Sequence, residues 1–332
     1  MTDLVVPAEA DWEAAPRLLE GAGSLALSVE QCNMAYWMSA VAQGTLLGRP
    51  LGYQPGAVTP DYMRRPGPLR EALVLEMTYR SLDEEAAVRV LTHYVAVAPD
   101  VPEMEFFSTQ LIDEVRHHMI FRDHLLELGE PQEGLMDRIR QRGATYLTEV
   151  LHPIRDFAIR IARDEQDYIG AVVAFAIIIE GILAASTELS EIKWAPFSPV
   201  TTEIERGASI DEIRHLAVGS TIVRDHLIKH PEGRDHLLDI IQRGKDMWGT
   251  ISDREYVMTR ERLYQEGMTA PEHAERLEGY EIYPGRLLRD TTPEERWDLA
   301  ATWNDELTEK RLEYMGLPEA MDLLRSKAPR IL

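Results

Sequence analysis

The chain has 332 residues, of which 45% are hydrophobic and 28% are charged, a composition typical of a globular protein. Its formal net charge of -22 argues against binding to nucleic-acid phosphates and to an anionic membrane surface. Cys32 is the single cysteine, so an intrachain disulfide is impossible and a reducing, cytoplasmic location is expected.

The first fifty residues predict one helix and no signal peptide. The opening stretch lacks a basic region followed by an apolar core. Ser28 is a plausible N-cap for a helix over residues 28–47. Met34, Trp37 and Met38 in this helix are interpreted as packing residues. A Gly/Pro-rich connection follows over residues 48–68.

The remainder of the chain shows helical periodicity and few strand-like alternations. Pro153 is expected to break or kink the third of the long helical patterns. The predicted helices cover approximately residues 69–97, 103–129, 133–166, 168–189, 201–230, 292–316 and 318–327. We expect one all-α domain over residues 1–332, with a core at 69–230 and a C-terminal helical extension at 231–332. The last helices are interpreted as a packing surface or an oligomer interface, so a homodimer is one of the expected oligomeric states.

The longest apolar stretch, Ile169 to Ala185, carries a carboxylate near its middle. The stretch is slightly short for a membrane span, so a buried helix of a soluble protein is the better interpretation. An unpaired carboxylate at Glu180 would then cost several kcal/mol. A bound metal cation removes that objection.

Two charged pentads recur about a hundred residues apart. "DEVRH" covers residues 113–117 and "DEIRH" covers residues 211–215, and each follows an A-P-x-x-P turn that begins at Ala98 or Ala195. Each pentad places Glu and His at i, i+3, so both side chains project from one helix face and can hold one metal ion. The pairs are Glu114 with His117 and Glu212 with His215. Carboxylate and imidazole ligands suit iron.

The two turns also indicate where further ligands lie. In an antiparallel hairpin, residues equidistant from the turn lie level with each other. Reflecting Glu114 through Pro99 gives Glu84, and reflecting Glu212 through Pro196 gives Glu180. Glu85 is a rival for Glu84 but lies on a less core-like face, and Glu76 lies too far from the hairpin turn. Four Glu and two His complete the ligand set of a dinuclear site in a helical bundle.

The other pentad residues are expected to support the ligands. A metal-bound His usually donates its other N–H to a carboxylate. Asp113 and Asp211 are candidates, either within one helix or crossed between the two. Arg116 and Arg214 would hold these carboxylates as ion pairs. A charged helix surface is the competing explanation of one pentad. For His118 a surface or packing role is expected, and for His124 and His226 a surface position.

These residues resemble the carboxylate-bridged di-iron proteins of the ferritin-like superfamily. The order E…ExxH…E…ExxH is similar to the oxygen-activating branch, which includes monooxygenase hydroxylase subunits, acyl-carrier-protein desaturases and di-iron N-oxygenases. The resemblance covers about residues 69–230 and implies a ferritin-like four-helix bundle with additional flanking helices. The chain departs from this pattern in three places. Leu183 and Ala184 stand where hydroxylases and desaturases commonly have a Thr, and Ala208 stands where N-oxygenases carry a His. Phe121 stands where ribonucleotide reductase radical subunits carry a Tyr.

The resemblance implies a non-haem di-iron monooxygenase with O2 as co-substrate. Glu84, Glu114 and His117 would bind one iron, and Glu180, Glu212 and His215 the other, with Glu114 and Glu212 able to bridge. Manganese fits similar ligands. A reductase or ferredoxin would supply the electrons. The expected apolar wall of the substrate pocket consists of Phe175, Ala176, Ile177, Ile179, Leu183 and Ala184.

The substrate is expected to be a small organic molecule, oxygenated at nitrogen or carbon with a slight preference for nitrogen, in natural-product tailoring. Two other functions stay open at this point. One is a di-iron oxidase or desaturase-like dehydrogenase. The other is a ferritin-like iron-binding protein, although the chain is about twice the length of a ferritin subunit. A non-catalytic partner subunit is disfavoured, because such subunits usually lose the ligands.

Overall fold

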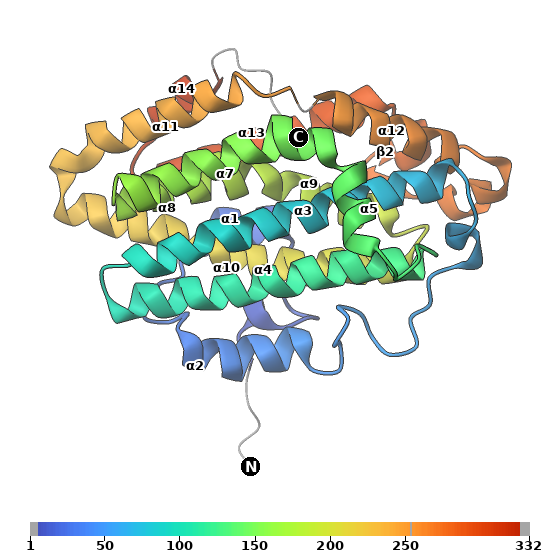
Figure 1. Cartoon of the computed structure of the whole chain (residues 1–332), viewed down its shortest axis with the longest axis horizontal. Coiled ribbons are helices and arrows are strands. Elements are labelled where there is room, and N and C mark those ends of the chain that lie inside the picture. The colour runs from blue at the N-terminus through green and yellow to red at the C-terminus, as the bar shows by residue number, and fades with distance from the viewer. Residues whose placement is uncertain (1–5, 253, 326–332) are drawn as a thin grey trace.

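The computed structural model describes residues 6–252 and 254–325 and confirms the all-α prediction. Helices form nearly all of the regular structure (Figure 1). The exception within the described residues is one antiparallel hairpin, β1 (Glu281–Tyr283) with β2 (Arg286–Leu287). The extreme N-terminal residues 1–5 and the end of the last predicted helix, Ser326 and Lys327, lie outside the described residues.

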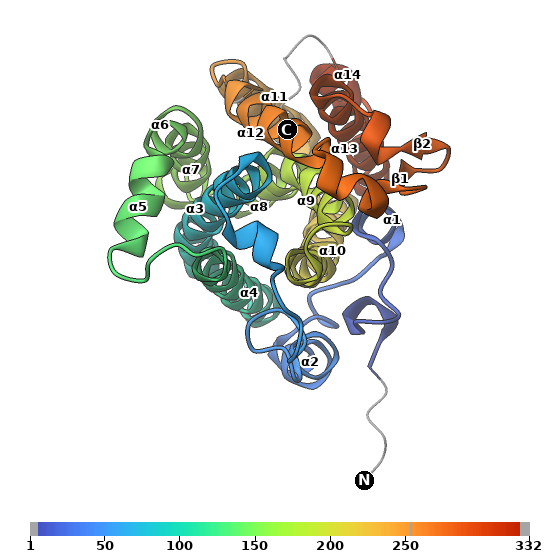
Figure 2. The same cartoon turned by 90° about the vertical axis from the view of Figure 1, so that its right-hand side faces the viewer.

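Four long helical rods form the centre of the molecule (Figures 1 and 2). The first hairpin consists of α3 (Pro68–Val97) and α4 (Val101–Glu127). The first arm of the second hairpin is one continuous rod of three parts: α8 (Tyr168–Val173), a π-helical segment (Ala174–Ile179) and α9 (Glu180–Trp194). Its second arm is the antiparallel helix α10 (Pro199–Lys229). The two hairpins pack against each other, so the chain contains the four-helix bundle that the paired pentads predict.

Local chemistry fixes both hairpin turns. Ser198 caps α10 by accepting the Thr201 N–H, and Pro199 occupies the first helical position, where a missing N–H costs nothing. Ala98 ends α3 in an extended conformation, and α4 begins two residues after Pro99. The A-P-x-x-P pattern therefore places the two pentads at matching heights in the bundle.

Shorter helices surround the bundle (Figure 2). α7 packs on α3, α11 packs on α8, α12 packs on α3, and α13 packs on α9 and α10. The flanking helices are α1 (Leu18–Ser24), α2 (Met34–Tyr36), α5 (Leu135–Arg142), α6 (Ala144–Tyr146), α7 (His152–Ile159), α11 (Arg234–Trp248), α12 (Arg254–Met268), α13 (Pro293–Met315) and α14 (Ala320–Arg325). Further π-helical segments cover 37–46, 147–151 and 160–164, and 3-10 turns cover 8–10, 61–64, 231–233, 271–277 and 288–290.

Two local predictions need correction. Ser28 does not cap the first predicted helix, because α2 begins at Met34 and the side chain of Asn33 accepts the Tyr36 N–H. The helix predicted over 168–189 continues to Trp194. Pro153 stands just after a π-helical segment, which relieves the loss of its N–H without ending the helical path.

The rod from Tyr168 to Trp194 is long and apolar enough to cross a membrane, with a mean hydropathy of 2.3 over its most apolar window. Within the described structure, 72% of that window is buried against the other helices. This burial favours the interpretation of a core helix. Apolar clusters lie at both ends of the bundle, so the layer that contains Glu180 is a polar layer between two hydrophobic ones.

The π-helical turn before Glu180 depends on a glycine. A Cβ atom built at Gly181 would lie 2.5 Å from the carbonyl oxygen of Ala176, five residues earlier. Ile179 has φ -111° and ψ -79°, away from the regular helix, where the rod returns to α-helical geometry. The wide turn thus requires the absence of a side chain at residue 181.

We expect Gly181→Ala to destabilise the fold by about 1–3 kcal/mol, because the new methyl group must displace the Ala176 carbonyl. Gly207→Ala in α10 is the matched control: its nearest neighbour, the ring of Trp12, would lie 3.4 Å away, and alanine is the better helix former. Urea unfolding measures both. A Gly181→Ala protein as stable as the control would contradict the steric account.

Candidate metal centre

Six side chains from the four rods converge in the polar layer. α3 supplies Glu84, α4 supplies Glu114 and His117, the first residue of α9 is Glu180, and α10 supplies Glu212 and His215. Ligand atoms of Glu114, Glu180, Glu212 and His215 all lie within 4.8 Å of one another, and the same holds for Glu84, Glu114 and His117. Glu114 belongs to both groups: its Oε2 lies 2.9 Å from Nδ1 of His117, and its Oε1 lies 3.3 Å from Nδ1 of His215.

Unsatisfied atoms in this cluster fit a metal. The Nδ1 atom of His215 lies 3.3 Å from carboxylate oxygens of Glu114 and Glu180 and 3.4 Å from Glu212. Neither this Nδ1 nor Oε2 of Glu212 has a hydrogen-bond partner among the described residues, although both are buried. Burial and then neighbouring carboxylates raise the pKa of Glu84 and of Glu180 well above the ordinary value. Two divalent cations would remove both the repulsion and the unsatisfied atoms. Mixed carboxylate and imidazole donors suit iron or manganese.

The two supporting aspartates are crossed between the helices. Asp211 of α10 lies 3.2 Å from Nε2 of His117, and Asp113 of α4 lies 3.3 Å from Nε2 of His215. Each imidazole can therefore donate its Nε2–H to a carboxylate and direct Nδ1 toward the glutamates. Burial opposes the charged imidazole of His117, but the hydrogen bonds to Asp211 and Glu114 outweigh it and raise its pKa to about 10.

The two arginines of the pentads balance these aspartates. Arg116 contacts Asp211, and Arg214 contacts Asp113 and also donates to Asp211 at 3.0 Å. Burial disfavours the Asp211 carboxylate, but Arg116 and Arg214 together hold its pKa below the ordinary range. The structure thus brings together, beside the two histidines, Asp113, Arg116, Asp211 and Arg214. The sequence left open whether each Asp supports the His of its own helix or of the other helix, and the structure has the second arrangement.

Two polar contacts were missed by the sequence analysis. Trp37 donates its indole N–H to Asp113 at 2.9 Å, and Gln110 donates its amide N–H to Glu180 at 2.9 Å. Gln110 lies one turn before Glu114 on the same face of α4, a signal that the sequence did contain. Trp37 gives no such signal, because its segment is brought to α4 by tertiary structure alone. Met38, expected to pack in the core, is 60% exposed.

The rivals of Glu84 lie elsewhere. Glu85 pairs with Arg89 at 2.6 Å on the outer face of α3. Glu76 is buried away from the cluster, where it accepts the Trp194 indole N–H at 3.1 Å. These positions favour Glu84 as the ligand from α3.

Other histidines of the sequence analysis lie outside the cluster. His118 contacts the carbonyl of Ser81 at 2.7 Å, as a packing residue would. His124, expected at the surface, is instead buried and contacts the Thr201 hydroxyl at 2.8 Å. His226 is half-buried. A third Glu-x-x-His pair, Glu149 and His152, lies outside the bundle, and Glu149 accepts the hydroxyl of Tyr256.

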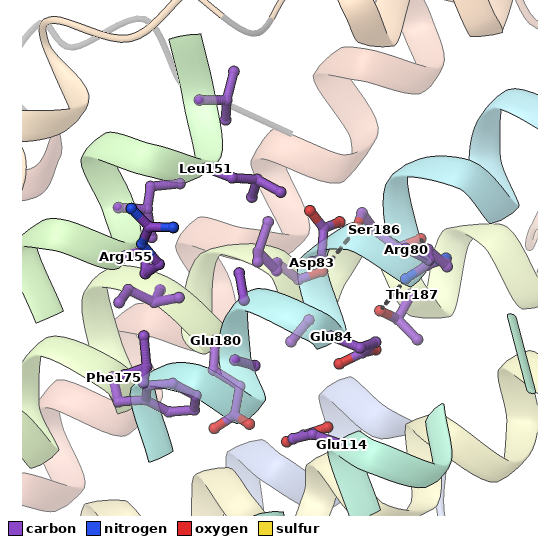
Figure 3. Close-up of a pocket in the computed structure, with 18 of the residues that line it drawn as sticks. Arg80, Asp83, Glu84, Glu114, Leu151, Arg155, Phe175, Glu180, Ser186 and Thr187 are labelled. Atoms are coloured by element: carbon purple, nitrogen blue, oxygen red, sulfur yellow. Dashed lines mark hydrogen bonds between the residues drawn. The ribbon is translucent and has the colours of Figure 1, made fainter. Parts of the chain in front are cut away.

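A cavity of about 110 Å³ adjoins the glutamates (Figure 3). Of the six residues expected in an apolar wall, Phe175, Ile179, Leu183 and Ala184 line it, and Ala176 and Ile177 do not. The expectation assumed α-helical spacing. In the π-helical turn the residue one turn before Glu180 is Phe175, and Ala176 faces Gly219 of α10 instead. Further lining residues include Asp83, Ala87, Val90, Tyr146, Leu151, Ile154, Arg155 and Trp248.

Comparisons with known proteins support the fold. No protein-family model and no curated protein sequence matches the chain. Among solved structures, a similar one is "Protein 19 with aldehyde deformylating oxidase activity" from Synechococcus, with 15% identity and a TM-score of 0.54. The match covers 79% of this chain and 98% of that one. The likeness confirms the ferritin-like four-helix bundle with additional flanking helices.

A pair of neighbouring substitutions tests the ligand from α3. We expect Glu84→Gln to lower the iron content of the protein from about two ions per chain toward one, because an amide binds iron poorly. Glu85→Gln, which changes a carboxylate on the outer face, should leave about two. Elemental analysis after anaerobic loading and desalting measures both. Equal iron content in the two variants would exclude Glu84 as a ligand.

Metal affinity should increase with pH between about 6 and 8. The pKa values of His117, His215, Glu84 and Glu180 are all raised, so the metal-free cluster holds protons near neutrality. A metal ion binds only the deprotonated ligands and must displace those protons. Anaerobic calorimetric titration with Fe²⁺ in buffers of different ionisation enthalpy would show proton release. A buffer-independent enthalpy and constant affinity would contradict this prediction.

Proposed function

We propose that the protein is a non-haem di-iron enzyme that activates O2 and inserts oxygen into a small organic substrate. The observation that carries the proposal is the position of the cavity. Glu84, Glu114, Glu180 and Glu212 line it together with apolar side chains, so a substrate in the cavity would lie directly against the metal ligands (Figure 3). A storage site needs no such enclosed apolar space.

The six side chains divide naturally between two ions. Glu84, Glu114 and His117 would hold one iron, and Glu180, Glu212 and His215 would hold the other. Glu114 reaches both groups, and Oε1 of Glu212 lies 4.0 Å from Nδ1 of His117, so either carboxylate is positioned to bridge. Two iron ions bound there would supply the electrons that reduce O2. Manganese fits the same donors.

The protein's own groups prepare the site for this chemistry. Asp113 and Asp211 keep the Nε2–H of each histidine engaged, so that Nδ1 points toward the ions. Gln110 orients Glu180 through its amide N–H. The apolar side chains of Phe175, Ile179 and Leu183 limit the access of water to the reacting substrate.

The cavity wall beyond Glu180 favours nitrogen as the oxygenated atom. Leu183 and Ala184 occupy the turn after Glu180 and offer no hydroxyl group, and the nearby Thr187 hydroxyl accepts a hydrogen bond from Arg80. An amine presents its own lone pair and needs no hydrogen abstraction from carbon. The two electrons of each turnover would come from a reductase or ferredoxin.

A second candidate is an oxidase that releases no oxygenated substrate. The structural neighbour from Synechococcus is described as having aldehyde deformylating oxidase activity, and the mainly apolar cavity of this chain would also accept an aldehyde. The two candidates differ in the fate of oxygen atoms in the organic product.

A single-turnover experiment separates the candidates. Protein loaded with Fe²⁺ is supplied with a chemical reductant, ¹⁸O2 and a panel of compact aromatic and aliphatic amines and aldehydes, and products are analysed by mass spectrometry. We expect an amine product that contains ¹⁸O, formed by the native protein and reduced by about 100-fold or more in Glu180→Ala.

Three results would contradict the proposal. Loss of the formyl carbon from an aldehyde, without a labelled amine, would favour the oxidase. Iron uptake far above two ions per chain would favour storage. Undiminished product formation by Glu180→Ala would remove the cluster from the reaction.

A further inference from the structure

A larger surface groove shares one lining residue with the cavity beside the glutamates. The groove has a volume of about 1240 Å³ and is lined mainly by α3, α7, the segment after α7, and α11. Three of these helices, α3, α7 and α11, also contribute residues to the cavity. Arg155 is the residue that lines both spaces among the described residues. A molecule in either space can therefore contact the side chain of Arg155.

Arg155 is the more available of the two cations on the cavity wall. The other, Arg80, is held inside the protein by Glu205 at 2.8 Å and by the Thr187 hydroxyl at 3.0 Å. Arg155 donates its hydrogen bonds to Asp156, its neighbour in the chain, at 2.8 and 3.1 Å. The side chain of Asp156 is 66% exposed, so water can replace it as a partner at little cost.

Arg155 and Arg80 lie on different sides of the cavity (Figure 3). The rest of the lining includes many apolar side chains, with Phe175, Leu151 and Ile154 among them. Asp83 is the one carboxylate of the lining outside the four glutamates, and the Tyr146 hydroxyl already occupies it at 2.8 Å. An anionic group in the cavity can therefore pair with Arg155 in place of the exposed Asp156, and an apolar group can pack against the apolar lining.

We propose that the substrate is a compact apolar molecule that carries a carboxylate remote from its reacting atom, and that Arg155 determines this specificity. A guanidinium group binds a carboxylate through two parallel hydrogen bonds, which fixes the orientation of the substrate as well as its charge. A cavity of about 150 Å³ holds one benzene molecule, so a space of about 110 Å³ limits the buried part of the substrate to at most about a single ring. The inference rests on the proposed function for the identity of the reacting site.

Binding of three probes of one shape tests the charge requirement. Benzoate, benzamide and benzylamine are titrated calorimetrically into iron-loaded protein under anaerobic conditions. We expect benzoate to bind about tenfold or more tightly than the other two. In Arg155→Gln the affinity for benzoate should fall to that for benzamide, and the affinity for benzamide should stay unchanged.

Arg160→Gln is the matched control. Arg160 lines the groove but not the cavity and pairs with Glu165 at 3.6 Å, so its loss should leave the preference for benzoate intact. Thermal unfolding shows whether each variant is folded. Iron content is measured separately, so failure of the di-iron proposal would appear as missing iron, independently of the binding results.

Three outcomes would overturn the inference in a folded, iron-loaded protein. Equal affinities for benzoate and benzamide would remove the requirement for charge. Unchanged benzoate binding in Arg155→Gln would place the carboxylate elsewhere, for example on the iron ions. An equal loss in Arg160→Gln would mean that only the general charge of the groove matters.

Discussion

Four largely buried carboxylates in one layer of a helical bundle impose the constraint on which the rest of the structure depends. Ions of like charge this close together and this far from water repel each other strongly. The surrounding side chains compensate only part of that repulsion, because Arg116 and Arg214 form ion pairs with Asp211 and Asp113. The ligand groups that remain face one another across a space that suits two cations.

The crossed aspartates connect the candidate centre to the fold. Each histidine receives its supporting carboxylate from the other hairpin, so neither hairpin completes the site alone. The arginines reinforce this exchange, since Arg116 of α4 contacts Asp211 of α10 and Arg214 of α10 contacts Asp113 of α4. The site is therefore complete only when the two hairpins pack together, and this gives a physical reason for the repeated pentad.

The sequence predicted what depends on helical spacing and on symmetry between the hairpins. Reflection through the two turns located Glu84 and Glu180, which the structure places in the cluster. Spacing alone was insufficient, since Glu149 and His152 share the i, i+3 pattern yet lie outside the bundle.

Departures from regular geometry explain what could not be predicted. The π-helical turn changes which residues precede Glu180 on its face of the helix, so the prediction that Ala176 lines the cavity was wrong. The only sign of this turn in the sequence is Gly181, whose missing side chain leaves room for the Ala176 carbonyl. Trp37 reaches Asp113 through a tertiary contact that no local pattern encodes. The same holds for Arg155, whose position depends on how α7 packs against α3.

The most direct test of the central claim is anomalous X-ray scattering from crystals of the iron-loaded protein, recorded at energies just above and just below the iron absorption edge. The account predicts two anomalous peaks in the polar layer, one bounded by Glu84, Glu114 and His117 and the other by Glu180, Glu212 and His215, with Glu114 between them. A bundle that keeps these six side chains together but shows no iron peak among them would contradict it.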